Sequence, residues 1–152
     1  MKDKEYFNII IQHKLNVAHA GIKIANEFFK EHPLMAKRVM LNCFNHDNRK
    51  VSAAIEFMHL RSADSEQFQE ALDSHRKNSK HHFQYWDDVT EIPLDVIGEM
   101  VCDWYARSCE MGTSLQDYVD DVLDTYAFTE NQIAMIQRCI SILTRPPFGE
   151  GD

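Results

Sequence analysis

Apolar side chains recur every three or four residues along almost the whole chain, and few residues interrupt this spacing. Only five glycines and four prolines occur among the 152 residues. We find no convincing two-residue alternation, which would indicate β-strands, and no internal repeat. The sequence therefore predicts an all-α protein. A chain of this length suffices for one domain, so we expect a compact single-domain helical bundle of about six or seven helices.

Proline, glycine and capping residues mark where the predicted helices begin and end. In chain order we expect helices over about residues 4–29, 33–45, 52–60, 65–86, 93–111, 114–126 and 129–143. Gly112 follows the fifth as a C-terminal cap, and Thr129 with Gln132 fits a capping box at the start of the seventh. The predicted domain covers residues 1–144, and residues 145–152 form a flexible tail that cannot continue a helix.

Composition narrows the classes of function. The formal net charge is −8 and no basic stripe occurs, so general nucleic-acid binding is not predicted. No apolar run approaches about 18 residues and the first residues lack a signal-peptide core, so we expect no membrane contact. Four cysteines without a C-x-x-C pair predict buried thiols in a reducing compartment, and hence a cytoplasmic protein. Self-association into a homo-oligomer stays open.

Two polar side chains interrupt the inward faces of helices. His13 lies within about 40° of Val17 and Ile24 around the axis of the first helix, and therefore points toward the core. A core histidine satisfied by hydrogen bonds would explain it, and so would a metal ligand. Asp103 lies near the inward side of the fifth helix, where a salt bridge to Arg107 and a ligand role are both compatible with the spacing.

The segment SHRKNSKHHFQYW adds further imidazoles in the fourth predicted helix. His75, Asn78 and His82 share one face of that helix, and Leu72 on the same side makes it an inward face. His81 lies about 120° from the centre of this face, where a surface histidine is as compatible as a functional one. Two histidines on one buried face each need hydrogen-bond partners, which makes a purely structural explanation less economical.

A metal ion would satisfy the inward polar residues together. A buried unpaired carboxylate costs several kcal/mol, so buried carboxylates are paired or bind metals. Imidazoles with carboxylates suit a divalent ion such as manganese, iron, cobalt, nickel or zinc. Adjacent residues at the end of a helix diverge by about 100°, so both can reach one ion beside the helix. The predicted ligands are His13, His46, Asp47, His82 and Asp103.

The order of these residues resembles the signature of the HD-domain superfamily of metal-dependent phosphohydrolases, which is all-helical. That signature has an early histidine, a His-Asp doublet and a distant aspartate, here His13, His46-Asp47 and Asp103. The chain is also similar to short bacterial and phage proteins of no assigned function, through His13-Lys14, NSKHHFQYW and Asp103-Trp104. The resemblance covers about residues 6–110. The doublet is followed here by Asn48-Arg49, where the best-known members have a small residue and glycine.

The resemblance implies hydrolysis of a nucleotide or another small phosphate ester, with one or two divalent ions, magnesium included. His13, His46, Asp47 and Asp103 would hold the first ion, which activates a water molecule for attack on phosphorus. His82, with His75 as a further candidate, would serve a second ion, and Asp47 would bridge the two. The implied catalytic residues are Asp47 and Lys50, and the implied substrate-side residues are Arg49, Lys50, His75, Asn78 and His81.

Two other functions stay open at this point. A minority of HD-type proteins hold a di-iron pair and activate oxygen, and the extra histidines suit such a pair. Alternatively the chain is a non-catalytic helical protein that binds a metal or a partner. The acidic segment SLQDYVDDVLDTY offers a partner surface, although a charged helix is usually just a solvated face.

Overall fold

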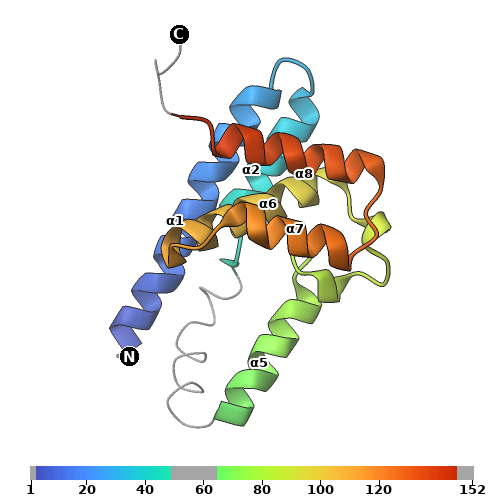
Figure 1. Ribbon diagram of the computed structural model, residues 1–152. Helices are drawn as coiled ribbons and strands as arrows, with labels where there is room; N and C mark the ends of the chain where they lie inside the picture. The colour runs from blue at the N-terminus through green and yellow to red at the C-terminus, as the bar shows by residue number, and fades with distance from the viewer. Residues whose placement is uncertain (1–2, 49–64, 147–152) are drawn as a thin grey trace.

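The computed structural model describes residues 3–48 and 65–146, shown in colour in Figure 1. Within these residues it contains six α-helices, two short 3₁₀-helices and no β-strand. The prediction of an all-α bundle is therefore confirmed. The α-helices are α1 (Asp3–Phe28), α2 (Pro33–Phe44), α5 (Ser65–Asn78), α6 (Leu94–Met111), α7 (Leu115–Thr125) and α8 (Glu130–Leu143), and the 3₁₀-helices are η1 (Phe83–Tyr85) and η2 (Val89–Glu91).

Helices α1, α2, α6 and α8 pack against one another around one apolar core, with α6 in the centre of the bundle (Figure 1). Burial of these apolar faces is the main source of stability in a domain of this kind. Helix α1 approaches α2 closely at Gly21, because a Cβ there would lie only 2.4 Å from the Cβ of Cys43. The largest fully buried apolar side chains include Ile24, Ile97, Met100, Ile136 and Leu143.

Local signals set several helix ends where the sequence predicts them. Pro33 occupies the first turn of α2, where its missing N–H leaves no helical hydrogen bond unmade. Gly112 ends α6 in the left-handed conformation, with φ of 66°. Thr129 and Gln132 form the predicted capping box at the start of α8, each side chain accepting a hydrogen bond from the other's backbone N–H.

The fourth predicted helix is shorter than the sequence suggests. Helix α5 ends at Asn78, and the chain then turns into η1. The ring of Phe83 stacks on Tyr126 with centroids 4.2 Å apart, so packing against the α7–α8 connection outweighs continuation of the helix. The sequence predicts that His75, Asn78 and His82 share one helix face. This prediction is wrong, because His82 lies beyond the helix that carries the other two residues.

Other predictions have mixed outcomes. Arg49, Lys50, the predicted helix over 52–60 and residues 147–152 of the predicted tail lie outside the described residues. Three cysteines are buried as expected, but Cys109 is exposed, so the prediction is wrong for that thiol. Among the described helices, none combines the length and apolarity that crossing a membrane requires.

Candidate metal centre

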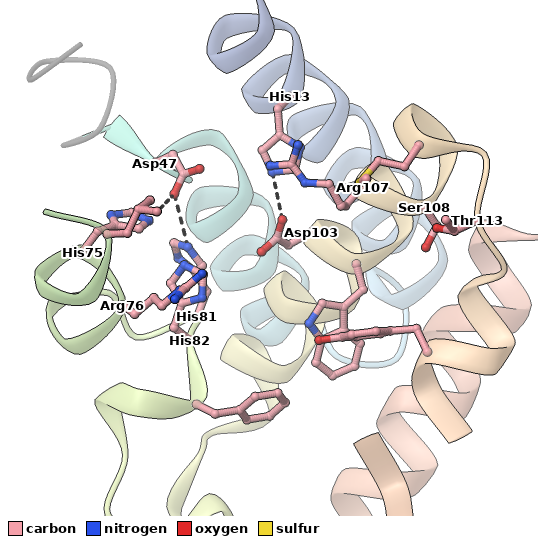
Figure 2. Close-up of a pocket in the computed structure, with 15 residues that line it drawn as sticks. His13, Asp47, His75, Arg76, His81, His82, Asp103, Arg107, Ser108 and Thr113 are labelled. Atoms are coloured by element: carbon pink, nitrogen blue, oxygen red, sulfur yellow. Dashed lines mark hydrogen bonds and ion pairs between the residues drawn. The ribbon is translucent and has the colours of Figure 1, made fainter. Parts of the chain in front are cut away.

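Helices α1 and α6 bring His13 and Asp103 together, although 90 residues separate them. The Nε2 atom of His13 lies 2.8 Å from Asp103 Oδ1, as the dashed line in Figure 2 shows. The other ring nitrogen, Nδ1, lies 2.9 Å from a carboxylate oxygen of Glu110. His13 is only 3% exposed, as its position in the apolar stripe predicts. The alternative bridge from Asp103 to Arg107 does not describe the structure, since Arg107 pairs with Glu110 at 3.2 Å.

The His46-Asp47 doublet lies in the turn that follows α2. The Nε2 atom of His46 is 3.4 Å from Asp47 Oδ2 and 3.6 Å from Asp103 Oδ1. Asp47 has a left-handed backbone with φ of 55°, a conformation that aspartate tolerates better than most residues. Lys14 of α1 donates hydrogen bonds to the carbonyls of Phe44 and His46 and so holds this turn in place. The four residues of the HD-type signature therefore lie together.

A second group of imidazoles lies on the other side of Asp47. His75 Nε2 and His81 Nε2 are 3.3 Å and 3.2 Å from Asp47 Oδ1 (Figure 2). The ring of His82 lies beside both, with its centroid 4.3 Å from that of His81. His81 is buried, so the surface alternative is wrong for it. The turn after α5 directs His81 toward Asp47, which a continuous helix would not do.

Asn78 does not join this cluster. It is exposed, and its side-chain amide donates to the Ser74 carbonyl of its own helix at 2.8 Å. The prediction that Asn78 faces inward is therefore wrong. The cause is the same early end of α5, since the last turn of a helix commonly uses its side chains to satisfy its own carbonyls.

Glu99 is a central member of the cluster that sequence reasoning missed. It is 2% exposed, and its Oε1 atom lies 3.2 Å from His46 Nδ1 and 3.3 Å from His81 Nδ1. A glutamate in a helix usually faces solvent, so the residue type alone does not predict that Glu99 is buried. Its position does indicate burial, because Glu99 lies inside the apolar run VIGEMVC and therefore on a helix that is buried on most sides.

Four imidazoles of the cluster, all except that of His82, share one orientation toward their neighbours. Each Nδ1 atom faces an oxygen, and each Nε2 atom faces a carboxylate of Asp47 or Asp103. Histidines that bind metals commonly make such a contact through the nitrogen that does not bind, which fixes the tautomer and the ring direction. The Nδ1 partners are Glu110 for His13, Glu99 for His46 and His81, and the Ser79 hydroxyl for His75.

The donor set fits a divalent metal. Within the described residues, four buried atoms make no hydrogen bond of acceptable geometry, although the first three lie in the ion-pair contacts described above: His46 Nε2, Asp47 Oδ1, His81 Nε2 and Glu99 Oε2. Unsatisfied buried polar atoms are unfavourable, and a cation among the first three would compensate them. Three overlapping sets have their ligand atoms within 4.8 Å of one another: His13 with His46 and Asp103, His46 with Asp47 and His81, and His75 with His81 and His82.

The charges of the cluster are strongly coupled. Burial by itself lowers the pKa of His46, but the carboxylates, Asp103 foremost, outweigh burial and hold that pKa well above its ordinary value. Burial likewise opposes ionisation of Asp47, yet the neighbouring His75 and His81 rings keep its pKa far below the usual range. Burial, with the charge of His81, lowers the pKa of His82 to about 4. His82 is therefore neutral near pH 7, as a metal ligand must be.

Six members of the cluster line a cavity of about 500 Å³ (Figure 2), namely His13, Asp47, His75, His81, His82 and Asp103. Aromatic side chains of Phe83, Trp104 and Tyr118 also line this cavity, as do the half-exposed Arg76 and Arg107. A polar wall with metal-binding character therefore adjoins apolar surface and two cations. A cavity of this size accommodates a small organic molecule.

Comparison with known families identifies the family of this chain but not its activity. Residues 2–144 match the model of a family of unknown function, DUF5662. The chain belongs to this family. No curated protein and no solved structure matches it significantly. The geometry of the cluster is therefore the basis for a function of this DUF5662 member.

Proposed function

We propose that this protein is a metal-dependent phosphohydrolase of the HD type that cleaves a small phosphate ester, such as a nucleotide. One observation carries the proposal: His13, Asp47 and Asp103 line a ligand-sized cavity, and the buried His46 contacts both aspartates, so that Nε2 and carboxylate atoms face one another. Buried imidazoles and carboxylates in this arrangement are what a divalent ion requires. The proposed ligands of the first ion are His13, His46, Asp47 and Asp103.

A second ion is proposed on the opposite side of Asp47. There His75 and His81 approach Asp47 most closely, and His82 stands beside them as a further ligand. This revises the set expected from sequence, in which His82 was the principal second-site ligand. Ions bound at these positions would lower the pKa of a coordinated water and neutralise developing charge on phosphoryl oxygens.

The other residues of the cavity suit an organic phosphate. Arg76 and Arg107 line the same cavity as the cluster and can neutralise the phosphate oxygens that point away from it. The aromatic wall of Phe83, Trp104 and Tyr118 offers apolar contact to the rest of the ester. Substrate contacts from Arg49 and Lys50 stay a prediction, because both lie outside the described residues.

The decisive experiment measures metal content and hydrolysis together. Wild type and Asp47→Asn are purified without chelators, and then assayed with p-nitrophenyl phosphate and nucleoside monophosphates under manganese, cobalt, zinc and magnesium. Asparagine tolerates the left-handed backbone of this position, so the variant changes the ligand and spares the turn. We expect one or two metal equivalents and turnover in wild type, and in the variant a loss of bound metal with a fall in turnover of at least the roughly 10–100-fold that altered metal sites show.

Asp124→Asn is the matched control for that experiment. Asp124 is an exposed aspartate of α7, away from the cluster, and its loss should leave metal content and turnover unchanged. Full turnover by Asp47→Asn would contradict the proposal, and so would a metal-loaded wild type that hydrolyses none of these esters.

A di-iron oxygenase is the second candidate. The observation that favours it is the set of three imidazoles, His75, His81 and His82, beside the carboxylate of Asp47, since nitrogen-rich sites suit iron. Protein purified in air would then contain two iron equivalents and absorb in the near-ultraviolet, and dithionite would remove that band. Iron content with this behaviour would place oxygen chemistry ahead of hydrolysis.

A further inference from the structure

Glu99 and Asp103 stand one helical turn apart on the same face of α6, and His46 lies between them. Asp103 faces the Nε2 side of the His46 ring, with 3.6 Å between the nearest atoms. Glu99 faces the Nδ1 side at 3.2 Å. One helix therefore supplies both a carboxylate for the metal side of the imidazole and a carboxylate for its opposite side.

The same oxygen of Glu99 serves a second ring. Its Oε1 atom also lies 3.3 Å from His81 Nδ1, and the His46 and His81 ring centroids are 4.1 Å apart. His46 shares one ligand set with His13 and Asp103, His81 shares another with His75 and His82, and the two rings meet in a third set with Asp47. A single buried carboxylate atom thus contacts one ligand of each proposed subsite.

We propose that Glu99 is a positioning residue shared by two metal subsites, and this inference rests on the metal centre proposed above. By accepting hydrogen bonds from both Nδ1–H groups, Glu99 selects the tautomer that leaves both Nε2 lone pairs free for ions. Its negative charge also makes both imidazoles stronger ligands. Loss of Glu99 therefore weakens both subsites together, although Glu99 itself binds no ion.

Glu110 provides a matched comparison within the chain. It contacts the Nδ1 atom of His13 at 2.9 Å, and so orients a ligand of the first subsite alone. Glu99→Gln should weaken two binding events, whereas Glu110→Gln should weaken one. His13→Ala identifies that event, because it removes a ligand of the first subsite directly.

The test is a titration of each metal-free protein with zinc, and with cobalt for its visible spectrum. We expect two equivalents in wild type, a loss of about 10–100-fold in the affinity of both events in Glu99→Gln, and a loss at the first event only in Glu110→Gln. The inference is overturned if Glu99→Gln keeps either event within twofold of wild type, or if Glu110→Gln weakens both equally.

A second variant and a spectroscopic measurement guard against a merely structural effect. Glu99→Asp keeps the charge but shortens the side chain by one methylene, so it cannot reach both rings, and it too should lose affinity at both events. Wild-type affinity in that variant would overturn the shared role. In the zinc-loaded protein, ¹⁵N resonances of two histidines should report protonated Nδ1 in contact with a carboxylate, and Glu99→Gln should change both while far-ultraviolet circular dichroism stays helical.

The outcomes separate this inference from the proposed function. Wild type that binds two zinc ions but hydrolyses no ester removes the phosphohydrolase and leaves the role of Glu99 standing. Wild type that binds fewer than two ions overturns the shared role, while hydrolysis by a single-ion enzyme stays possible.

Discussion

Helices α1 and α6 each contribute to two buried regions that differ in kind. In the apolar region, Ile24 of α1 belongs to the same buried cluster as Ile97 and Met100 of α6, and such apolar side chains need no hydrogen-bond partner. In the polar cluster, His13 of α1 meets Asp103 of α6, and several buried atoms nearby make no hydrogen bond of acceptable geometry in the described part of the chain. The apolar side chains are fully buried, whereas part of the polar cluster lines a cavity.

The difference separates a region that stabilises the fold by itself from one whose side chains suit the proposed binding of a metal. Apolar burial stabilises by roughly 25 cal/mol per Å² and needs no ligand. A buried set of imidazoles and carboxylates gives little or no net stability unless charges and hydrogen bonds match, because removing such groups from water is unfavourable. The proposed metal ions would therefore account for the cluster better than a contribution to fold stability does.

The largest expected effect is on the free energy of unfolding, compared between a variant of the apolar region and a variant of the polar cluster. Ile97→Ala should lower the free energy of unfolding by about 2–5 kcal/mol, because it leaves a cavity in the apolar core. Saturating zinc, at about 100 times its dissociation constant, should still add about 2.7 kcal/mol to that variant. Asp103→Asn should lose stability by a smaller amount and gain almost nothing from zinc. Chemical denaturation with and without zinc measures all four values.

That comparison breaks down if zinc stabilises Asp103→Asn as much as Ile97→Ala. Zinc would then be held by residues other than Asp103, and only a failure of zinc to stabilise either variant would mean that the buried polar atoms satisfy one another alone. Circular dichroism at low temperature serves as the control, since both variants must be folded before denaturation begins.

A second prediction concerns how closely the helices of the apolar region approach. At Gly21 an added Cβ would lie 2.4 Å from the Cβ of Cys43, which cannot rotate away, so Gly21→Ala should lose about 1–3 kcal/mol. At Gly98 the nearest atoms are 3.0–3.3 Å away and belong to the side chains of Val39 and Met135. The higher helix propensity of alanine offsets that crowding, so Gly98→Ala should be nearly neutral. Thermal unfolding of the two variants in parallel decides, and equal losses would contradict the prediction.

The sequence predicts the apolar region better than the polar one, for physical reasons. Helical spacing along α1 and α6, the proline in the first turn of α2 and the capping box of α8 depend on local rules, and the structure follows them. His13 and Asp103 were placed inward by the same periodicity. The end of α5 depends instead on a distant contact, the stacking of Phe83 on Tyr126. No residue within SHRKNSKHH indicates that the helix ends there.

The positions of His81 and Glu99 show the consequence. A helix that continued through His81 would turn that ring away from His75, whereas the turn after α5 brings both rings to Asp47. Glu99 then gains its role because His46 and His81 arrive on the same side of α6. Such a meeting of three segments depends on tertiary packing, so residue types and spacing along one segment do not reveal it.

The third prediction uses pH to separate the two regions. Neighbouring carboxylates raise the pKa of His46 and of His81 above the ordinary imidazole value, although burial opposes this. Above about pH 6.5 the unfolded chain has lost these protons while the folded metal-free protein keeps them. Its stability should therefore fall as pH rises through the folded pKa values, by up to about 1.4 kcal/mol per pH unit for each retained proton.

Zinc affinity should change with pH in the opposite direction. An ion must displace the protons on His46 and His81, so affinity should rise by up to about tenfold per pH unit for each proton released. Calorimetry in buffers of different ionisation enthalpy counts these protons. Ile97→Ala should retain both slopes, because its substitution lies in the apolar region. A zinc affinity that is constant between pH 6 and pH 8 would contradict the proposed ligand set.

The smallest expected effect lies where the two regions join. Lys14 of α1 donates to the carbonyls of Phe44 and His46, and so connects the apolar hairpin of α1 and α2 to the turn that carries Asp47. Lys14→Met keeps most of the apolar stem and removes the donors. We expect a loss of about 1 kcal/mol in stability, typical of hydrogen bonds to the last carbonyls of a helix. Zinc affinity should also fall several-fold, because the left-handed turn at Asp47 loses a contact that holds it.

Lys23→Met separates these two effects. Lys23 lies on the same helix and donates to the Leu143 carbonyl at the end of α8, at 3.3 Å and away from the cluster. Its loss should lower stability by a similar amount and leave zinc affinity unchanged. If both variants bind zinc as wild type does, the Asp47 turn is held by the packing of the apolar region alone. If only Lys14→Met binds zinc weakly, α1 supplies the centre with a ligand in His13 and, one residue later, with the support for its neighbouring ligands.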